Sequence, residues 1–226
     1  MGQKDFVDDH LESSEMARPS QPGEEVEAPS LVPRGRGHLP EKGRIGGVMQ
    51  IPFPDKKYQI IVVDPPWEIS KIKKRVRPNQ VDMDYPMMTL PEISALHIAS
   101  IADEKCTCFV WTIDKYLYQT PYILRAWGFK YHLTMAWDKT NGLAMYGFNR
   151  QTEFIVVGLK GKHDAYPKRK TIRSSFSAKS QYHSAKPDLF YEMLDSLEGK
   201  RIDIFARKER KSFLIKNRWD VWGNEV

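Results

Sequence analysis

Residues 58–67 read YQIIVVDPPW, an apolar run that ends in an acidic, proline-rich turn. Residues 58–63 are rich in β-branched side chains, which is typical of a strand buried on both faces of a parallel sheet. Asp64 precedes a proline and is therefore biased towards an extended conformation. Pro65 and Pro66 fix φ and contribute no backbone N–H. The stretch predicts a central strand that ends in a rigid turn.

The same turn presents hydrogen-bond acceptors beside a flat ring. The Asp64 carboxylate and the Pro65 carbonyl can both accept hydrogen bonds from one amino group. Pro66 is expected to support them rigidly, and Trp67 offers a face on which a base can stack. This combination suits methyl transfer to a planar exocyclic amine such as adenine N6, and no metal is required. The alternative interpretation is an edge-strand turn with a buried tryptophan.

Strands and helices are predicted to alternate after this turn. Alternating elements build an α/β domain with a mostly parallel sheet, in which ligands gather beyond the carboxyl ends of the strands. Asp64 and Arg207 each follow a predicted strand, so both are expected at that edge. The predicted strands after the first cover residues 106–112, 129–137, 153–159 and 201–206.

The first predicted helix begins with a strong local signal. Thr89 is expected to cap it, and Glu92 can complete a capping box with Thr89. Pro91 lies in the first turn, where a missing N–H costs nothing. The sequence therefore predicts that a helix starts at Thr89.

Two more helices are predicted further along the chain. Residues 114–127 look helical, although Pro121 must kink or divide them and Gly128 should end them. Residues 187–197 form the other helix, with Pro187 at its first position. The apolar stripe of that helix consists of Leu189, Phe190, Met193, Leu194 and Leu197.

The charge of the chain is unevenly distributed. Residues 1–30 carry two basic and eight acidic side chains, a net charge of −6, whereas the whole 226-residue chain carries +6. Residues 31–226 therefore carry +12, which indicates a polyanionic partner, with solubility as the alternative. Residues 1–48 lack periodicity and are rich in Pro, Gly, Ser and Glu, so they are expected to be disordered or loosely attached. Residues 49–226 are expected to form the folded domain.

Composition argues against several other classes of protein. No apolar stretch approaches the length of a membrane span, and the polar N-terminus does not resemble a signal peptide. Cys106 and Cys108 are the only cysteines, too few for a zinc site. They are interpreted as two small residues in a strand, in keeping with a reducing, intracellular setting.

Three basic runs are expected to border the cleft at the sheet edge. The first, residues 71–77, includes Lys73, Lys74 and Arg75, and the others lie in residues 168–173 and 208–218. Solvated loops are the usual outcome for any one run, but three together favour a phosphate-binding rim. No groove-reading motif is present, so we expect mostly backbone contacts, with the target base unpaired or flipped out.

Four blocks of sequence resemble the family named for the 70-kDa MT-A subunit of messenger-RNA adenosine methyltransferase. The blocks are residues 64–67 (DPPW), 137–141 (WDKTN) with 153–158 (EFIVVG), 183–188 (HSAKPD), and 204–207 (IFAR) with 219–225 (WDVWGNE). The acceptor block comes first and the cofactor blocks last, which is similar to the permuted order of amino-methyltransferases. The last run looks more like the prokaryotic and phage branch than the eukaryotic one.

The resemblance implies a Rossmann-like methyltransferase fold with helices on both faces of the sheet, and S-adenosylmethionine as the cofactor. Lys186 lies at the start of a predicted helix, where it suits the carboxylate of the cofactor's methionyl group. The residues implied to contact the cofactor are Asp64, Lys186, Phe205, Arg207, Asn224 and Glu225. The residues implied or expected to contact the substrate are Trp67, Tyr85, Lys139, Asn141 and Glu153, with Lys73, Lys74 and Arg75.

The leading hypothesis is therefore an S-adenosylmethionine-dependent adenine-N6 methyltransferase whose partner is nucleic acid. DNA is favoured over RNA because the branch looks prokaryotic or phage. An RNA adenine methyltransferase is the alternative among enzymes, and a catalytically silent relative that binds nucleic acid or supports an active partner is the alternative outside them. A homo- or heterodimer is possible. A cytoplasmic location is expected, either associated with the nucleoid or, for a phage protein, in a bacterial host.

Overall fold

The computed structural model describes residues 52–69, 87–140, 147–148, 150–162, 171–180, 185–206 and 218–223. All of them belong to the second of the two units of the chain, Lys42–Val226. Residues 1–48, with their predicted disorder, lie outside the described residues. The domain boundary near residue 49 therefore stays a prediction.

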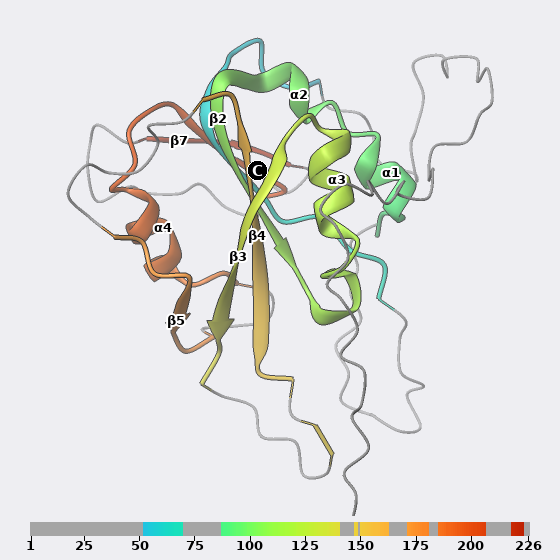
Figure 1. Ribbon diagram of the computed structural model, residues 1–226, viewed down its shortest axis with the longest axis vertical. Coiled ribbons are helices and arrows are strands. Elements are labelled where there is room, and N and C mark those ends of the chain that lie inside the picture. The colour runs from blue at the N-terminus through green and yellow to red at the C-terminus, as the bar shows by residue number, and fades with distance from the viewer. Residues whose placement is uncertain are drawn as a thin grey trace, which may run out of the picture. The chain divides into compact units, whose positions relative to one another are not determined.

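A seven-stranded sheet in the order β5-β3-β4-β2-β1-β6-β7 lies at the centre of the described part (Figure 1). Among these strands β4 alone runs against the other six. The prediction of a mostly parallel α/β sheet is confirmed. The strands are β1 (Tyr58–Val63), β2 (Ala102–Thr112), β3 (Lys130–Asp138), β4 (Thr152–Lys160), β5 (Ser175–Ser177), β6 (Arg201–Ile204) and β7 (Trp219–Trp222).

Strand β1 is central, as its sequence predicts. It pairs in parallel with β2 on one side and β6 on the other. Its side chains alternate between two cores: Ile61 and Val63 pack on one face of the sheet, and Ile60 and Val62 on the other. All four are at most 2% exposed. The alternative interpretation of an edge strand is therefore wrong.

Helices cover both faces of the sheet, which confirms the expected layering (Figure 1). The core that contains Ile61 also contains Ile93, Ile98 and Leu124 from the first three helices. The core that contains Ile60 also contains Phe190 from the last one. The helices are α1 (Leu90–Ser94), α2 (Ile98–Ile101), α3 (Thr120–Ala126) and α4 (Asp188–Leu194).

The predicted helix signals before β3 are confirmed. The Thr89 N–H donates to Glu92 Oε2 at 2.8 Å, so the capping box forms at the start of α1. The predicted helix 114–127 is divided into a 3₁₀ turn, η1 (Asp114–Tyr116), and α3, with Pro121 in the first turn of α3. Gly128 follows α3 with a φ of 83°, a left-handed conformation that glycine adopts without strain.

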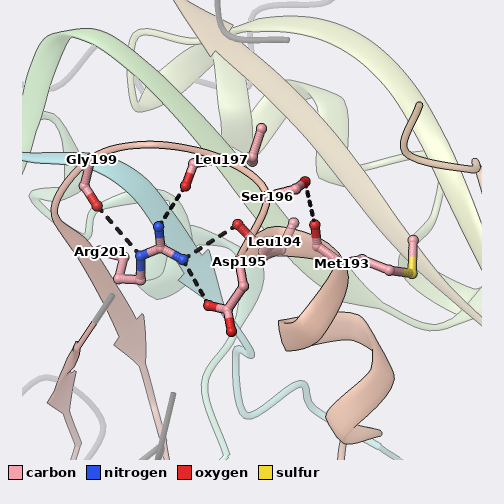
Figure 2. A network of polar contacts seen from close by, with 7 residues as sticks. All are labelled: Met193, Leu194, Asp195, Ser196, Leu197, Gly199 and Arg201. Atoms are coloured by element: carbon pink, nitrogen blue, oxygen red, sulfur yellow. Dashed lines mark hydrogen bonds and ion pairs between the residues drawn. The ribbon is translucent and has the colours of Figure 1, made fainter. Parts of the chain in front are cut away.

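Helix α4 is shorter than predicted at both ends. Pro187 caps it rather than forming its first residue, and it ends at Leu194. The Arg201 guanidinium donates hydrogen bonds to the carbonyls of Leu194, Leu197 and Gly199 (Figure 2). These carbonyls therefore have hydrogen-bond partners without a continuation of the helix. The prediction that Leu189 belongs to the apolar stripe is wrong. Leu189 is 39% exposed, whereas the neighbouring Phe190 is fully buried, so Leu189 points away from the sheet.

Other strand boundaries also differ from the predictions. Strand β2 begins four residues earlier than predicted, at Ala102. Strand β6 ends at Ile204, because Phe205 has a φ of 65° that cannot continue a strand. The interpretation of the two cysteines is confirmed: Cys106 and Cys108 are free, buried residues of β2. Burial raises the pKa of the Cys106 thiol to about 12.

Candidate active site

Side chains from several elements meet at one edge of the sheet. Since β1, β3 and β6 run in the same direction, their carboxyl ends share an edge, and the antiparallel β4 begins there. Asp64 follows β1 and Phe205 follows β6. Lys139 follows β3, and Glu153 is the second residue of β4. Lys186 joins them from the segment just before α4.

A chain of ion pairs connects four of these side chains. Lys186 Nζ lies 3.1 Å from Asp64 Oδ1 and 3.2 Å from Glu153 Oε2. The other oxygen of that carboxylate, Glu153 Oε1, lies 2.6 Å from Lys139 Nζ. Two ammonium groups thus alternate with two carboxylates, and their formal charges cancel. The sequence predicted roles for all four residues, and the structure brings them into contact.

Burial and ion pairing have opposite effects on the pKa values of Lys186 and Glu153. The Lys186 side chain is 10% exposed and that of Glu153 is 16% exposed. Burial disfavours the charged form of Lys186, but the carboxylates of Asp64 and Glu153 outweigh it and raise the lysine pKa. Burial also disfavours the Glu153 carboxylate, but Lys186 and Lys139 outweigh it and lower the pKa of Glu153. Both groups are therefore charged at neutral pH.

Backbone hydrogen bonds fix the turn that carries Asp64. The Trp67 N–H donates to the Pro65 carbonyl at 2.8 Å, and the Met88 N–H donates to the Pro66 carbonyl at 2.8 Å. The Pro65 carbonyl, which we expect to accept from a substrate amine, thus already accepts one hydrogen bond. A carbonyl oxygen has two lone pairs, so it retains the capacity for a second bond.

Trp67 is a buried part of the site rather than an open wall. Its ring is 6% exposed and stacks on the Tyr116 ring, with centroids 4.9 Å apart and planes at 19°. Its indole N–H donates to the Trp111 carbonyl at 3.0 Å. The alternative interpretation of the turn also predicted a buried tryptophan, and that part of it agrees with the structure. Trp67 therefore anchors the Asp64 turn to β2 and leaves little surface for a stacked base.

Trp111 is a further candidate site residue, which the sequence reasoning missed. Lys186 Nζ lies 5.1 Å from the centroid of its ring, a cation–π contact. The residue is 1% exposed, and its Nε1 has no hydrogen-bond partner among the described residues. It is the second-last residue of β2, which pairs in parallel with β1. The sequence contained a signal for it: the predicted strands 58–63 and 106–112 were expected to be parallel, so the ends that carry Asp64 and Trp111 should lie at the same edge of the sheet.

Phe205 turns the chain sharply at the end of β6. Its backbone is left-handed, and its N–H donates to the Trp222 carbonyl at 2.6 Å. The rings of the two residues meet edge to face, with centroids 5.4 Å apart. A side chain at Gly223 would have its Cβ 3.0 Å from the Ala206 carbonyl oxygen, so β6 and β7 continue into closely packed backbone. The half-buried Phe205 ring lies at this edge.

Several predicted site residues lie outside the described residues, and their roles stay predictions. They are Tyr85, Asn141, Arg207, Asn224, Glu225, Lys73, Lys74 and Arg75. Within the described ranges, no group of three or more His, Cys, Asp or Glu side chains is placed to hold a metal ion. No helix in the described ranges is long and apolar enough to cross a membrane.

The fold and the site together define an α/β protein of the methyltransferase class, with an Asp-Pro-Pro-Trp turn at the carboxyl edge of its sheet. The sequence model of the MT-A70 family matches residues 58–225. This range covers more than half of the chain, and the chain belongs to the MT-A70 family. The resemblance noted from the sequence is confirmed.

Three relatives differ in how much of their length the chain matches. The Type II methyltransferase M.MunI of Mycoplasma is 29% identical over 195 residues, which are 77% of this chain and 80% of that protein. The N(6)-adenosine-methyltransferase MT-A70-like protein of Drosophila melanogaster is 24% identical over 75% of this chain, but only 27% of its own length is matched. The N6-adenosine-methyltransferase non-catalytic subunit MTB of Arabidopsis thaliana is 32% identical over 46% of this chain and 14% of its own length.

Proposed function

We propose that this chain transfers a methyl group from S-adenosylmethionine to adenine N6 in nucleic acid, with DNA as the favoured substrate. The observation that carries the proposal is the Asp64 carboxylate, held by Lys186 at the carboxyl edge of the sheet in a proline-stiffened turn. Membership of the MT-A70 family and the likeness to a Type II methyltransferase and to an N(6)-adenosine-methyltransferase support it.

The acceptor turn addresses the weakness of the nucleophile. The lone pair of an adenine amino group is delocalised into the ring, so its nitrogen attacks poorly. The Asp64 carboxylate, 28% exposed, and the second lone pair of the Pro65 carbonyl can accept from the two N–H groups. Such acceptors stabilise the positive charge that develops on nitrogen, and a well-aimed partner contributes about 3 kcal/mol. The ion pair with Lys186 holds the carboxylate in one place for this task.

The described residues fit the proposed cofactor. S-adenosylmethionine, when bound, supplies an electrophilic methyl group on a sulfonium. The edge of the sheet offers a half-buried Phe205 ring, a carboxylate at Asp64 and the ammonium of Lys186. An ammonium has three N–H donors, and the contacts of Lys186 with Asp64 and Glu153 account for two of them, which leaves one for a carboxylate. The buried, unsatisfied Nε1 of Trp111 is a further donor beside Lys186.

A catalytically silent role is the second candidate. The match to the non-catalytic subunit MTB favours it, although that match covers 46% of this chain. The intact Asp64–Trp67 block argues against it, because a silent protein has no need of a positioned acceptor. The two candidates differ in whether methyl transfer occurs at all.

The test is methyl transfer from labelled S-adenosylmethionine to matched single- and double-stranded DNA and RNA. We expect incorporation into DNA and identification of N6-methyladenine after digestion to nucleosides. Asp64→Ala should abolish incorporation while the protein stays folded by circular dichroism. Glu198→Ala, which removes an exposed carboxylate after α4, should leave incorporation unchanged. Incorporation into RNA alone would favour the RNA enzyme, and nucleic-acid binding without incorporation would favour the silent role.

A further inference from the structure

A groove of about 500 Å³ lies between β3 and residues 114–122, which include η1 and the start of α3. Three tyrosines line it: Tyr118, Tyr122 and Tyr131. Leu117 and Pro121 contribute apolar surface between them. We call this feature the tyrosine groove. It is separate from the ion-pair chain and from every residue assigned a role above.

The rings of the tyrosine groove are unusually exposed. Tyr118 is 76% exposed and Tyr131 is 53% exposed. The rings of Tyr118 and Tyr122 contact each other, with centroids 5.8 Å apart, and their hydroxyl oxygens are hydrogen-bonded at 3.4 Å. The Tyr131 hydroxyl lies 3.2 Å from Thr134 Oγ1. A cluster of exposed aromatic rings is typical of binding surfaces.

The segment that lines one side of the tyrosine groove also packs on the acceptor turn. Tyr116 of η1 stacks on Trp67, three residues after Asp64, and its hydroxyl donates to the Glu68 carbonyl at 2.5 Å. Lys115 Nζ also donates to that carbonyl, at 3.1 Å. Tyr118, two residues after Tyr116, lines the groove. Residues 114–118 therefore carry both the contact with the acceptor turn and part of the groove lining.

Three basic side chains either belong to the elements that line the tyrosine groove or pair with one of its lining residues. Arg150 is exposed, and its Nε lies 3.4 Å from Oδ2 of Asp114, the one acidic side chain among the lining residues. Arg125 is exposed on α3, three residues after Tyr122 and so on the same side of the helix. Lys115 is exposed on η1. Exposed aromatic rings with basic side chains nearby suit unpaired nucleic acid, whose bases can stack on the rings while its phosphates meet the cations.

We propose that the tyrosine groove binds an unpaired stretch of nucleic acid that flanks the target nucleotide, with bases stacked on Tyr118 and Tyr131. The inference rests on the proposed function for the identity of the substrate, and it adds that the substrate is single-stranded or locally opened beside the target base. Stacking is available to every base, so the groove sets strandedness and affinity rather than sequence.

The test is the affinity of the full chain for fluorescent 12-nucleotide single strands of DNA and of RNA, measured by anisotropy. Tyr118→Ala and Tyr131→Ala should each weaken binding about tenfold, the effect of losing one stacked base. Tyr118→Phe should bind like the unchanged chain, because the ring remains. Leu189→Ala removes an exposed apolar side chain from α4, on the other face of the sheet, and should have no effect.

Two further measurements keep the outcome decisive. Photocrosslinking of the unchanged chain to oligonucleotides that carry 5-iodouracil should label peptides containing Tyr118 or Tyr131, whatever the folding of the variants. Sedimentation should give the same mass for the unchanged chain and the alanine variants. The proposal would be overturned if the alanine variants kept the affinity of the unchanged chain, or if no crosslink formed in the groove. It would also be overturned if the variants had a lower mass as well as weaker binding, and that result would identify the groove as an interface between copies of this chain.

Binding and methyl transfer can fail separately. If the proposed methylation is wrong but the tyrosine groove is right, the unchanged chain incorporates no label and the alanine variants still lose affinity. If the groove is wrong but methylation is right, Tyr118→Ala retains both the KM for a single strand and the kcat. A paired result, with raised KM and unchanged kcat in Tyr118→Ala, supports both.

Discussion

Lys186 Nζ lies 3.1 Å from Asp64 Oδ1, so a residue expected to hold the cofactor also contacts the residue expected to receive the amine. The same ammonium contacts Glu153 at 3.2 Å. One lysine therefore separates two carboxylates that would otherwise face each other at the edge of the sheet. The acceptor and cofactor functions that the sequence predicted for separate blocks share a single counter-ion.

Lys186→Met should destabilise the fold and weaken cofactor binding. The change leaves Asp64 and Glu153 without their shared cation, and removing one partner of a fully buried pair costs about 3–5 kcal/mol. Because Asp64 is 28% exposed, we expect the free energy of unfolding in urea to fall by about 2 kcal/mol at pH 8. Lys186→Arg keeps the charge and should recover most of that loss. A variant with methionine that is as stable as the unchanged chain would contradict this role.

Glu153→Gln should produce a pH-dependent loss of stability. The pKa of Glu153 is lowered in the folded chain from 4.5, so its charge stabilises the fold above that pH and the contribution disappears as the pH falls. We expect the variant to unfold with about 2 kcal/mol less free energy at pH 7, the scale of a hydrogen bond to a charged group. The two proteins should converge as the pH falls through the lowered pKa of Glu153 in the folded chain.

Urea titrations at several pH values check this prediction. The pKa of Lys186 is raised from 10.5, so its own contribution persists up to that pH and is lost as the pH rises through the folded value. The difference between the unchanged chain and Glu153→Gln should therefore be widest between these limits. Glu104→Gln, which changes an exposed acid in β2, serves as the control and should leave the free energy of unfolding nearly unchanged. A difference that grows as the pH falls would exclude the ion-pair explanation.

The sequence predicted those elements whose local pattern and tertiary role agree. Residues 58–63 form the expected strand to the residue, since an apolar run is also what a central position demands. The division of a helix at Pro121 follows from the chemistry of proline. The end of β6 was not predictable, because a left-handed Phe205 opposes its own backbone preference. Strand β5 carries no apolar run and is defined only by its pairing with β3.

The site was predictable as a set of residues but not as a set of contacts. The sequence named Asp64, Lys139, Glu153 and Lys186 as candidates, yet nothing in it shows that they alternate in one chain of charges. Their order depends on β4 running against its neighbours, which brings its first residues to the carboxyl edge. The burial of Trp67 depends likewise on a distant residue, since Tyr116 covers its ring.

Arg201→Met should destabilise the fold without altering the active site. The buried guanidinium donates to three backbone carbonyls at 2.7–3.4 Å and pairs with Asp195 Oδ1 at 3.1 Å (Figure 2). Because methionine leaves these acceptors unsatisfied, we expect a loss of at least about 3 kcal/mol, each buried group costing about 1–3 kcal/mol. The melting temperature should fall by about 6–12 °C for a domain of this size.

Scanning calorimetry measures this shift, and Arg201→Lys provides the comparison. A lysine keeps the charge but cannot reach all the acceptors at once, so it should recover only part of the loss. Arg201 begins β6, at the end of the strand away from Phe205, so the folded variant should bind S-adenosylmethionine with unchanged affinity. A shift of less than about 2 °C for the methionine variant would show that the network in Figure 2 contributes little.

Gly158→Ala should overpack the core between β4 and α3, and a smaller neighbour should relieve it. A Cβ at Gly158 would lie 2.8 Å from Leu124 Cδ2 and 3.0 Å from Phe129 Cβ, and Leu124 is fully buried. We expect a loss of about 1–3 kcal/mol in the free energy of unfolding. Leu124→Ala alone creates a cavity and costs about 2–5 kcal/mol. If the two side chains compete for the same volume, the double variant Gly158→Ala/Leu124→Ala should lose less free energy of unfolding in urea titrations than the sum of the two single losses. Strictly additive losses would show that the backbone of β4 moves instead.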